Sequence, residues 1–512
     1  MSAPAALPKR RRNVYYLDTL EEFPYQTERN ISKVKRVFVN RNLKMKSIRM
    51  IGFDMDHTLA MYNKVMIEQL AFDMTKRKMV EEKKYPTEVQ ELKYDSEFVI
   101  RGLVVDKVHG NVLKLDKHQY VVTVHHGKQT LSREMRKIIY TNKRPDLANP
   151  EFYSVDTLFS IPEVALYAEM ISSFEVDGKI FGKTYQELFD DIRFCIDKTH
   201  RDGTLKAQIL ANPELYFVKD PNMALSLDKF IRSGKVLFLL TNSKLDYTDA
   251  VMSYLLNGEL EQYPDWKDYF EFILVDSGKP EFFLKGTPMK PLMTKDYTAR
   301  DKRLGVKRAK IYERGSSQQF EEVAGFKGEE VLYVGDHTFG DILRSKKSSG
   351  WRTAMVIEEL EREIQVAERV AGMYDELDKV EELRNELRFQ SNLVSEKIEQ
   401  LRETKMQDYE KKSAEELIAL DHEMEQASEK LNRLEHRLTQ NLIKIKELQT
   451  KVDKAFNPYW GPLFKAGKEN SRFGDQVEDY ACIYTSRSSN FLLYPSNKYF
   501  QTMRELMAHE RD

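Results

Sequence analysis

Asp54 and Asp56 stand two positions apart in the segment FDMDHTLA, residues 53–60, which continues the apolar run SIRMIGF. Such a run predicts a short strand that is buried on both faces. Burying an ionised carboxylate is costly unless it is paired or binds a metal, so two acids at the end of a strand need a cation, a substrate or solvent. The alternative is a solvated turn with a helix-capping aspartate, and this octapeptide alone favours neither interpretation.

These two carboxylates could catalyse phosphoryl transfer. Asp54 can act as a nucleophile and form an acyl phosphate, which divides one difficult displacement into two easier steps. Asp56 could protonate the leaving alcohol and then activate a water molecule. A carboxylate attacks a phosphate dianion only when the charges are screened, so the reaction requires Mg²⁺ held by oxygen ligands. Asp336 and Asp341, in the segment GDHTFGD, supply further carboxylates.

Groups that could hold the phosphate follow two other apolar runs. Thr241 and Asn242 offer a hydroxyl, an amide and backbone N–H groups to phosphate oxygens. Lys279 adds the positive charge that stabilises the transition state of phosphoryl transfer.

The elements that must position these residues are predicted to be strands of one parallel α/β sheet, because helix-like segments lie between some of the apolar runs. Such sheets bind ligands at the carboxyl ends of their strands. All four candidate motifs fall at such ends, which favours a chemical role for the acids over a solvated turn. The further runs are KVLFLLTNS (235–243), FEFILVDSGKP (270–280), EEVLYVGDHTFGD (329–341) and WRTAMVI (351–357).

Residues 61–225 are too many for a plain crossover between strands, so we expect an inserted subdomain. Strand-like segments come first and helical segments follow, which predicts an α+β composition. An insertion that leaves the catalytic edge and returns to it is well placed to act as a cap.

Residues 358–454 are rich in charge and poor in glycine. Two interleaved apolar series with a seven-residue period predict coiled-coil seams, with a turn near KMQDYEKKSAEE (405–416). An antiparallel hairpin within the chain and an intermolecular coil would bury similar seams, and the charged turn favours the hairpin. Asn441 interrupts one series and would set the register. The clearest series is Leu417, Met424, Leu431, Leu438, Ile445 and Val452.

The composition restricts the remaining function classes. The 81 Lys and Arg balance 82 Asp and Glu, so there is no global electrostatic case for binding nucleic acid or an anionic membrane. The two cysteines are too few for a disulfide framework, which predicts a reducing, cytoplasmic location. No run approaches transmembrane length, and the basic KRRR near the N-terminus is not followed by a signal-peptide core.

Together these features predict five parts in a chain of 512 residues, which is too long for a single core. They are an N-terminal tail and lead-in (1–46), a catalytic core (47–60 and 226–357), an inserted cap (61–225), a coiled-coil hairpin (358–454) and a C-terminal segment that packs on the core (455–512).

The order of DMDHT, Thr241, Lys279 and GDHTFGD resembles the four-motif signature of the haloacid dehalogenase-like phosphohydrolases. Longer segments, among them FDMDHTLA, TNSKLDYTDAVMSYLL and YVGDHTFGDILRSKKSSGWRT, resemble the cytosolic purine 5'-nucleotidase (type II) family over most of the chain. The resemblance implies a Rossmann-like parallel sheet, Mg²⁺-dependent hydrolysis of purine nucleoside 5'-monophosphates such as IMP and GMP, and a homo-oligomer. A phospho-aspartate can also be intercepted by a nucleoside, which would make the enzyme a phosphotransferase.

Residue by residue, the resemblance makes Asp54 the phosphorylated nucleophile and Asp56 the acid and base. It makes Asp54, the Asp56 carbonyl and Asp336 the protein ligands of Mg²⁺. Thr241, Asn242 and Lys279 would hold the phosphate. The residues that it places around the purine are Phe159, Arg193, Asp197, His200 and Lys206.

The spacing of the purine-site residues is chemically reasonable by itself. Arg193, Asp197 and His200 share one helix face, so a guanidinium and a carboxylate could meet the 6-oxo and N1–H groups of a base together. The structural alternative is equally ordinary: Arg193 and Asp197 form an i,i+4 salt bridge, His200 is a helix C-terminal charge, and Phe159 is part of a core.

Two acids depart from the effector site of the regulated family members. Asp156 replaces an Asn and Asp479 replaces an Arg, while Phe339 and Lys347 remain. An acid facing an effector phosphate is repulsive, which argues against allosteric activation. The rival function from another class is a catalytically silent scaffold that presents the coiled coil to a protein partner.

Overall fold

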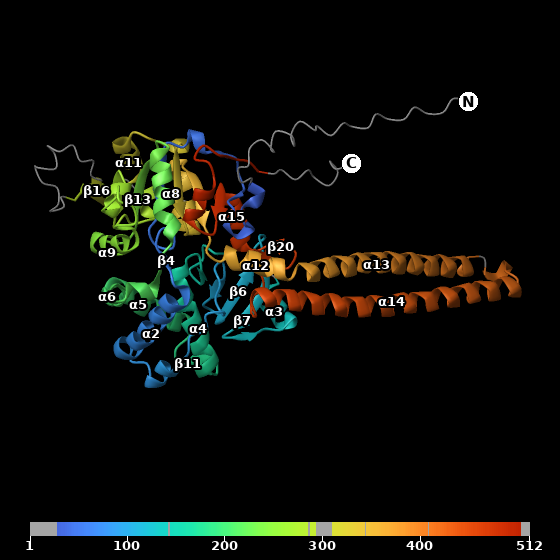
Figure 1. Ribbon diagram of the computed structural model, residues 1–512. Coiled ribbons are helices and arrows are strands. Elements are labelled where there is room, and N and C mark those ends of the chain that lie inside the picture. The colour runs from blue at the N-terminus through green and yellow to red at the C-terminus, as the bar shows by residue number, and fades with distance from the viewer. Residues whose placement is uncertain are drawn as a thin grey trace, which may run out of the picture.

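The computed structural model describes residues 28–141, 144–284, 287–292, 310–343, 345–407 and 409–502 (Figure 1). Within these residues, nine strands form the main sheet in the order β1-β21-β18-β17-β3-β13-β14-β16-β15. Neighbours from β21 to β16 run parallel, and the edge strands β1 and β15 run antiparallel. The strands are β1 (Phe38–Val39), β3 (Met50–Phe53), β13 (Val236–Leu240), β14 (Phe272–Val275), β15 (Lys290–Pro291), β16 (Lys310–Glu313), β17 (Val331–Gly335), β18 (Arg352–Val356) and β21 (Ile483–Thr485).

Strand β3, which carries the first acidic motif, lies in the middle of this sheet between β13 and β17. All four of its residues are buried, as expected for a strand that is covered on both faces. Gly52 is needed there because a Cβ at this position would lie 2.0 Å from the ring of Phe238 on β13. The chain therefore delivers Asp54 to the centre of the sheet edge.

Helices connect the parallel strands and keep their carboxyl ends on one edge. Helix α8 (Pro221–Arg232) precedes β13, α9 (Leu245–Leu256) joins β13 to β14, and α11 (Ser317–Ala324) precedes β17. The α/β class and the parallel-rich sheet predicted from the sequence are confirmed.

The inserted residues fold into a body of their own beside the sheet (Figure 1). The insertion starts at β4 (Met61–Tyr62), and the chain comes back through β12 (Phe217–Val218), which pairs antiparallel with β4. Five strands of the insertion form a second sheet in the order β8-β7-β6-β5-β9. The strands of this second sheet are β5 (Val104–Asp106), β6 (Asn111–Leu115), β7 (Val121–His126), β8 (Gln129–Thr130) and β9 (Phe152–Ser154). The main helices of the insertion are α2 (Lys64–Lys83), α3 (Arg133–Tyr140), α4 (Ile161–Phe174), α5 (Tyr185–Arg201) and α6 (Thr204–Ala211).

The C-terminal segment contacts both bodies. Strand β21 extends the main sheet beside β18. Trp460 is buried in the hydrophobic core of the insertion, where its backbone carbonyl accepts a hydrogen bond from the Lys114 ammonium at 2.7 Å. Residues 1–27 of the predicted N-terminal tail lie outside the described residues.

Two long helices, α13 (Ala371–Met406) and α14 (Ala414–Phe456), lie side by side and project from the body (Figure 1). The short helix α12 (Leu360–Arg369) leads into them. Asn441 is buried between the helices and donates a hydrogen bond to the Val380 carbonyl at 3.1 Å, which fixes their register. The long apolar stretch that a membrane-spanning helix requires is not found in any helix of the described segments.

Candidate active site

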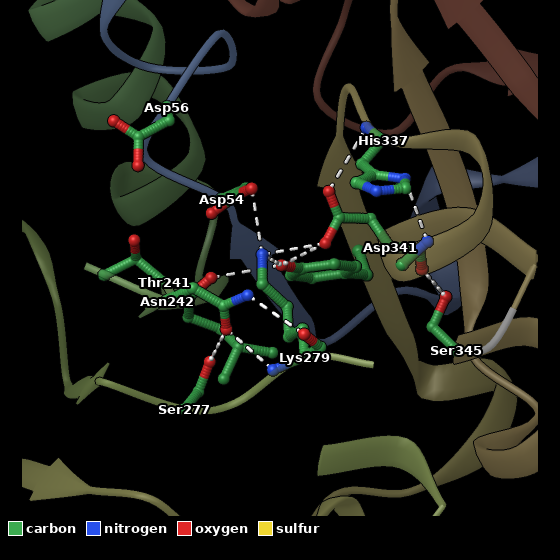
Figure 2. Close-up of polar contacts among 12 residues, drawn as sticks. Asp54, Asp56, Thr241, Asn242, Ser277, Lys279, His337, Asp341 and Ser345 are labelled. Carbon is green, nitrogen blue, oxygen red and sulfur yellow. Dashed lines mark hydrogen bonds and ion pairs between the residues drawn. The ribbon is translucent and has the colours of Figure 1, made fainter. Parts of the chain in front are cut away.

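Four neighbouring strands bring the predicted catalytic residues together at one edge of the sheet (Figure 2). Asp54 follows β3, Thr241 and Asn242 follow β13, and Lys279 follows β14. Asp336 and Asp341 follow β17, which lies on the other side of β3. Segments that are far apart in the sequence thus supply a single cluster of charged groups.

Three buried aspartates converge in this cluster. Asp54, Asp336 and Asp341 each present a carboxylate oxygen within 4.8 Å of those of the other two. Burial raises the pKa of Asp54 well above its usual range and that of Asp336 to about 6. Converging buried carboxylates are unfavourable unless a cation neutralises them. Because all the converging atoms are oxygens, the cluster fits Mg²⁺ as the sequence predicts.

Lys279 supplies one positive charge to the cluster. Its ammonium lies 2.9 Å from Asp54 Oδ2 and 2.7 Å from Asp341 Oδ1, and it donates to the Tyr333 hydroxyl at 3.0 Å. Burial alone would lower the pKa of Lys279, but Asp341 and Asp54 outweigh burial and raise it. The ammonium therefore stays charged beside the candidate nucleophile.

Asn242 and Thr241 organise the loops that carry these groups. Asn242 Oδ1 accepts hydrogen bonds from the Lys279 backbone N–H at 2.6 Å and from the Ser277 hydroxyl at 3.0 Å (Figure 2). The Thr241 side chain is fully buried, and its hydroxyl accepts the Ser243 backbone N–H at 3.1 Å. In this structure both residues hold the strand ends in place.

The Asp56 carboxylate points away from those of Asp54 and Asp341 (Figure 2). The Tyr62 hydroxyl donates to Asp56 Oδ1 at 2.7 Å, and the Ser243 hydroxyl donates to Oδ2 at 3.1 Å. Tyr62 also shares a 2.9 Å hydrogen bond with the Tyr247 hydroxyl. Two hydroxyls thus fix the orientation of Asp56, so any contribution of this residue to a metal site comes from its backbone carbonyl.

A cavity of about 530 Å³ opens beside the acids. The main sheet and the insertion both line it, so the predicted catalytic edge and most of the predicted purine-site residues face the same space. The predicted residues among its lining are Asp54, Asp56, Phe159, Asp197, His200, Lys206, Asn242, Lys279, Asp336 and Asp341.

Arg193 differs from the other purine-site candidates because it is not among the residues that line the cavity. Its guanidinium donates to both oxygens of the buried Glu163, at 2.8 and 2.9 Å, and to the Tyr153 hydroxyl at 2.7 Å. It also lies 3.4 Å from Asp197, the i,i+4 salt bridge of the structural alternative. In this structure Arg193 neutralises Glu163.

Phe159 and His200 line one aromatic side of the cavity. The Phe159 ring contacts His57 and His200 edge-on, with centroids 4.9 and 5.8 Å away. Burial lowers the pKa of His200 to about 4, so its imidazole is neutral at physiological pH. Lys206 lies over the Tyr247 ring, 4.6 Å from its centroid, and supplies a cation on the same side.

Several supporting residues were not predicted from the sequence. Arg101 is buried and donates to the Asp336 backbone carbonyl at 2.9 Å, while it pairs with Glu359. Tyr62 carries no motif signal, because its role depends on the pairing of β4 with β12. Of the supporting residues named here, only Ser243 could have been indicated by the sequence alone, because it belongs to the polar segment TNS that follows an apolar run.

Of the two departures at the effector positions, Asp156 makes a contact through its carboxylate and Asp479 through its backbone. Asp156 Oδ1 lies 2.9 Å from Arg472, and the Asp479 backbone carbonyl accepts the Lys346 ammonium at 2.7 Å. The side chains of Phe339 and Lys347 lie outside the part of the chain that is described.

Comparison with known proteins defines the class of this site. A family model described as the 5' nucleotidase family matches residues 37–512, and the chain belongs to this family. It is accordingly a hydrolase of phosphate monoesters.

Individual relatives agree with this assignment. A 5'-nucleotidase domain-containing protein of Dictyostelium discoideum is 30% identical over 482 residues, which cover 93% of this chain and 74% of that protein. The 5'-nucleotidase domain-containing protein 2 of Rattus norvegicus is 26% identical over 486 residues, which cover 93% of this chain and 80% of that protein. A crystal structure of a predicted phosphoglycolate phosphatase from Haemophilus somnus is 13% identical with a TM-score of 0.27, covering 60% of this chain and 85% of that one, which is too distant to support an argument.

Proposed function

We propose that the protein is a Mg²⁺-dependent 5'-nucleotidase that hydrolyses 6-oxopurine nucleoside monophosphates such as IMP and GMP, with a phospho-aspartate formed at Asp54. One observation carries this proposal. A single cavity is lined from the main sheet by the acids and by Lys279, and from the insertion by Phe159, Asp197 and His200. A nucleotide offers one group to each set, a phosphate and a base.

In the first step, an oxygen of Asp54 attacks the phosphorus, and the bond from phosphorus to the 5'-oxygen breaks. Asp56 gives its proton to that oxygen, and the nucleoside leaves. In the second step, Asp56 takes a proton from water, whose oxygen attacks the same phosphorus. The carboxylate of Asp54 is then released with inorganic phosphate.

The other groups of the cluster stabilise charge. Lys279, 2.9 Å from Asp54, stands where negative charge develops on the transferred phosphoryl group. Asp54, Asp336 and Asp341, with the Asp56 carbonyl, would hold Mg²⁺, which screens the phosphate from the carboxylates when it is bound. Tyr62 and Ser243 orient Asp56.

The base would be recognised from the insertion. Phe159 offers a ring for stacking, and Asp197 offers an acceptor for the N1–H of a 6-oxopurine. Neutral His200 and the Lys206 ammonium can donate to its 6-oxo group. This division of labour supports a role for residues 61–225 as a cap over a haloacid dehalogenase-like core.

Transfer of the phosphoryl group to a nucleoside rests on the same intermediate. A nucleoside hydroxyl that enters the cavity in place of water would take the phosphoryl group from Asp54. Labelled inosine added during GMP hydrolysis should then yield labelled IMP, and none at millimolar inosine would contradict transfer.

The test of the proposed function is a panel of nucleoside monophosphates assayed for phosphate release with Mg²⁺. We expect IMP and GMP to be hydrolysed by the wild type and by Asp421→Asn, a matched change on the exposed hairpin, but not by Asp54→Asn. Phosphate release that persists in Asp54→Asn would show that Asp54 is not the nucleophile. A folded wild-type protein that releases no phosphate from any nucleotide would favour the scaffold alternative.

A further inference from the structure

Tyr247 lies behind the hydroxyl that orients Asp56. It belongs to the first turn of helix α9, and its side chain is buried. Its hydroxyl lies 2.9 Å from the Tyr62 hydroxyl, which in turn donates to Asp56 Oδ1 at 2.7 Å. Three side chains from separate segments therefore form a continuous hydrogen-bond network that ends on the proposed acid and base.

The hydrogen bonds of this network can point in only one direction. Burial raises the pKa of both phenols above the usual range, so each keeps its single proton at physiological pH. An ionised Asp56 only accepts hydrogen bonds, so the Tyr62 proton points toward it. The Tyr62 oxygen must then accept the hydrogen bond of Tyr247. Tyr247 thereby holds the Tyr62 hydroxyl in the one orientation that serves Asp56.

The turn between β13 and α9 reaches both oxygens of the Asp56 carboxylate. Ser243 donates directly to Oδ2 at 3.1 Å. Tyr247, four residues later, reaches Oδ1 through Tyr62. Residues 243–247 therefore hold the carboxylate from two sides, and the loss of either contact leaves it fixed at only one oxygen.

The two tyrosine rings are themselves held by residues of the insertion. Tyr62 lies opposite Phe217 in the β4–β12 pair, where the insertion leaves and rejoins the core, and their ring centroids are 4.7 Å apart. The Lys206 ammonium of α6 lies 4.6 Å from the centroid of the Tyr247 ring. The network thus connects Asp56 to the base of the insertion.

We propose that Tyr247 is a positioning residue for the hydrolysis, which acts on Asp56 through the Tyr62 hydroxyl. This inference rests on the proposed role of Asp56 as acid and base. The network adds no proton to the reaction, because the proton that Asp56 gives to the 5'-oxygen in the first step is regained from water in the second. Removing the Tyr247 hydroxyl should therefore slow the steps that move this proton and leave nucleotide binding unchanged.

The Tyr247→Phe variant of the full-length enzyme tests this role. We expect kcat for IMP to fall about three- to tenfold, with KM within about twofold of the wild type. For para-nitrophenyl phosphate, kcat/KM should change less, because its leaving group needs no proton. Tyr254→Phe is the matched control and should keep the wild-type values, since Tyr254 lies on the same helix but is not among the residues that line the cavity.

A double-variant cycle tests whether Tyr247 acts through Tyr62. In the Tyr62→Phe background, adding Tyr247→Phe should lower kcat for IMP by no more than about twofold, because the network is already broken. Thermal melting checks that the variants are folded. A wild-type kcat in Tyr247→Phe, equal losses in kcat/KM with both substrates, or losses that multiply in the double variant would overturn this inference alone. A folded wild type that hydrolyses no nucleotide would overturn it together with the proposed function.

Discussion

The catalytic edge and the helical hairpin place charges in opposite environments. At the edge, the side chains of Lys279 and Asp341 are 4% and 1% exposed and lie 2.7 Å apart. On the hairpin, those of Lys444 and Glu376 are 47% and 48% exposed at a similar distance of 2.9 Å. Breaking a buried pair leaves an uncompensated charge, whereas an exposed pair contributes about 0–1 kcal/mol. Similar pairs of residues therefore differ greatly in how well they tolerate substitution.

The two regions also differ in how they are specified. The seam of the hairpin is specified by a local seven-residue repeat, and one buried residue, Asn441, fixes its register. The edge depends on four strands and on the insertion, so each of its side chains is held by residues far away in the sequence. Changes at the edge should therefore abolish function, while changes on the hairpin should leave turnover intact.

The largest contrast is expected from removing one lysine in each region. Lys279→Met should lower kcat about 100- to 1,000-fold, because it deletes the charge that stabilises the transferred phosphoryl group. Lys444→Met, its matched control on the hairpin, should keep the wild-type rate. Phosphate release from IMP measures both, with thermal melting to show that the variants are folded. Equal rates in the two variants would remove the distinction between the regions.

A smaller effect is expected from the hydroxyl that orients Asp56. Tyr62→Phe should lower kcat for IMP at least tenfold, since it deletes the 2.7 Å hydrogen bond to the acid and base. The loss should be smaller for para-nitrophenyl phosphate, whose leaving group needs no proton. A general packing defect would slow both substrates equally. Tyr409→Phe, exposed at the turn of the hairpin, is the control.

A stability effect is expected from a buried histidine of the insertion. Burial lowers the pKa of His125 to about 4, against about 6.5 in an unfolded chain. Between these two pKa values the unfolded state binds a proton that the folded state does not bind. The contribution of neutral His125 to the free energy of unfolding is therefore complete above pH 6.5 and is lost as the pH falls toward 4. It amounts to about 2 kcal/mol between pH 7 and pH 5.

Urea unfolding at the two pH values measures this loss. His125→Phe should lose less stability than the wild type on acidification, and His436→Gln, exposed on the hairpin, should behave like the wild type. If His125→Phe and the wild type lost the same free energy of unfolding, another group would be responsible.

The smallest effect on turnover is expected from the largest deletion. Replacing residues 373–452 by a short linker should leave Asp54-dependent hydrolysis measurable, because no residue of the cavity lies in this segment. Loss of all activity in a variant shown by circular dichroism to be folded would mean that the hairpin supports the active site.

The same difference explains what the sequence could and could not predict. The strands β3, β13, β14, β17 and β18 stand where the apolar runs place them, because a strand buried on both faces is a continuous apolar run. The edge strands are short and lack that signal, and β21 joins the sheet from the far end of the chain. Their places depend on tertiary packing.

In the candidate site, too, residues at the ends of the predicted strands could be predicted from the sequence, and residues placed by tertiary packing could not. Asp54, Lys279 and Asp341 lie at strand ends, so the motifs predicted that they would meet, and they do. Arg193 had two interpretations from its helix spacing, and its pairing with the buried Glu163 depends on a neighbouring helix that the spacing does not describe. Tyr62, one of the two partners of Asp56, was missed for the same reason, because it is positioned by β12.

The most direct test of the account is to trap the intermediate on Asp54. The enzyme is mixed with IMP labelled in its phosphate, quenched in acid within one turnover, reduced with borohydride and digested for mass spectrometry. We expect label in the quenched protein and reductive modification at Asp54 in the peptide that contains residues 53–60, and neither in Asp54→Asn. Steady turnover of IMP without label on the protein, or with the modification at another residue, would contradict the account.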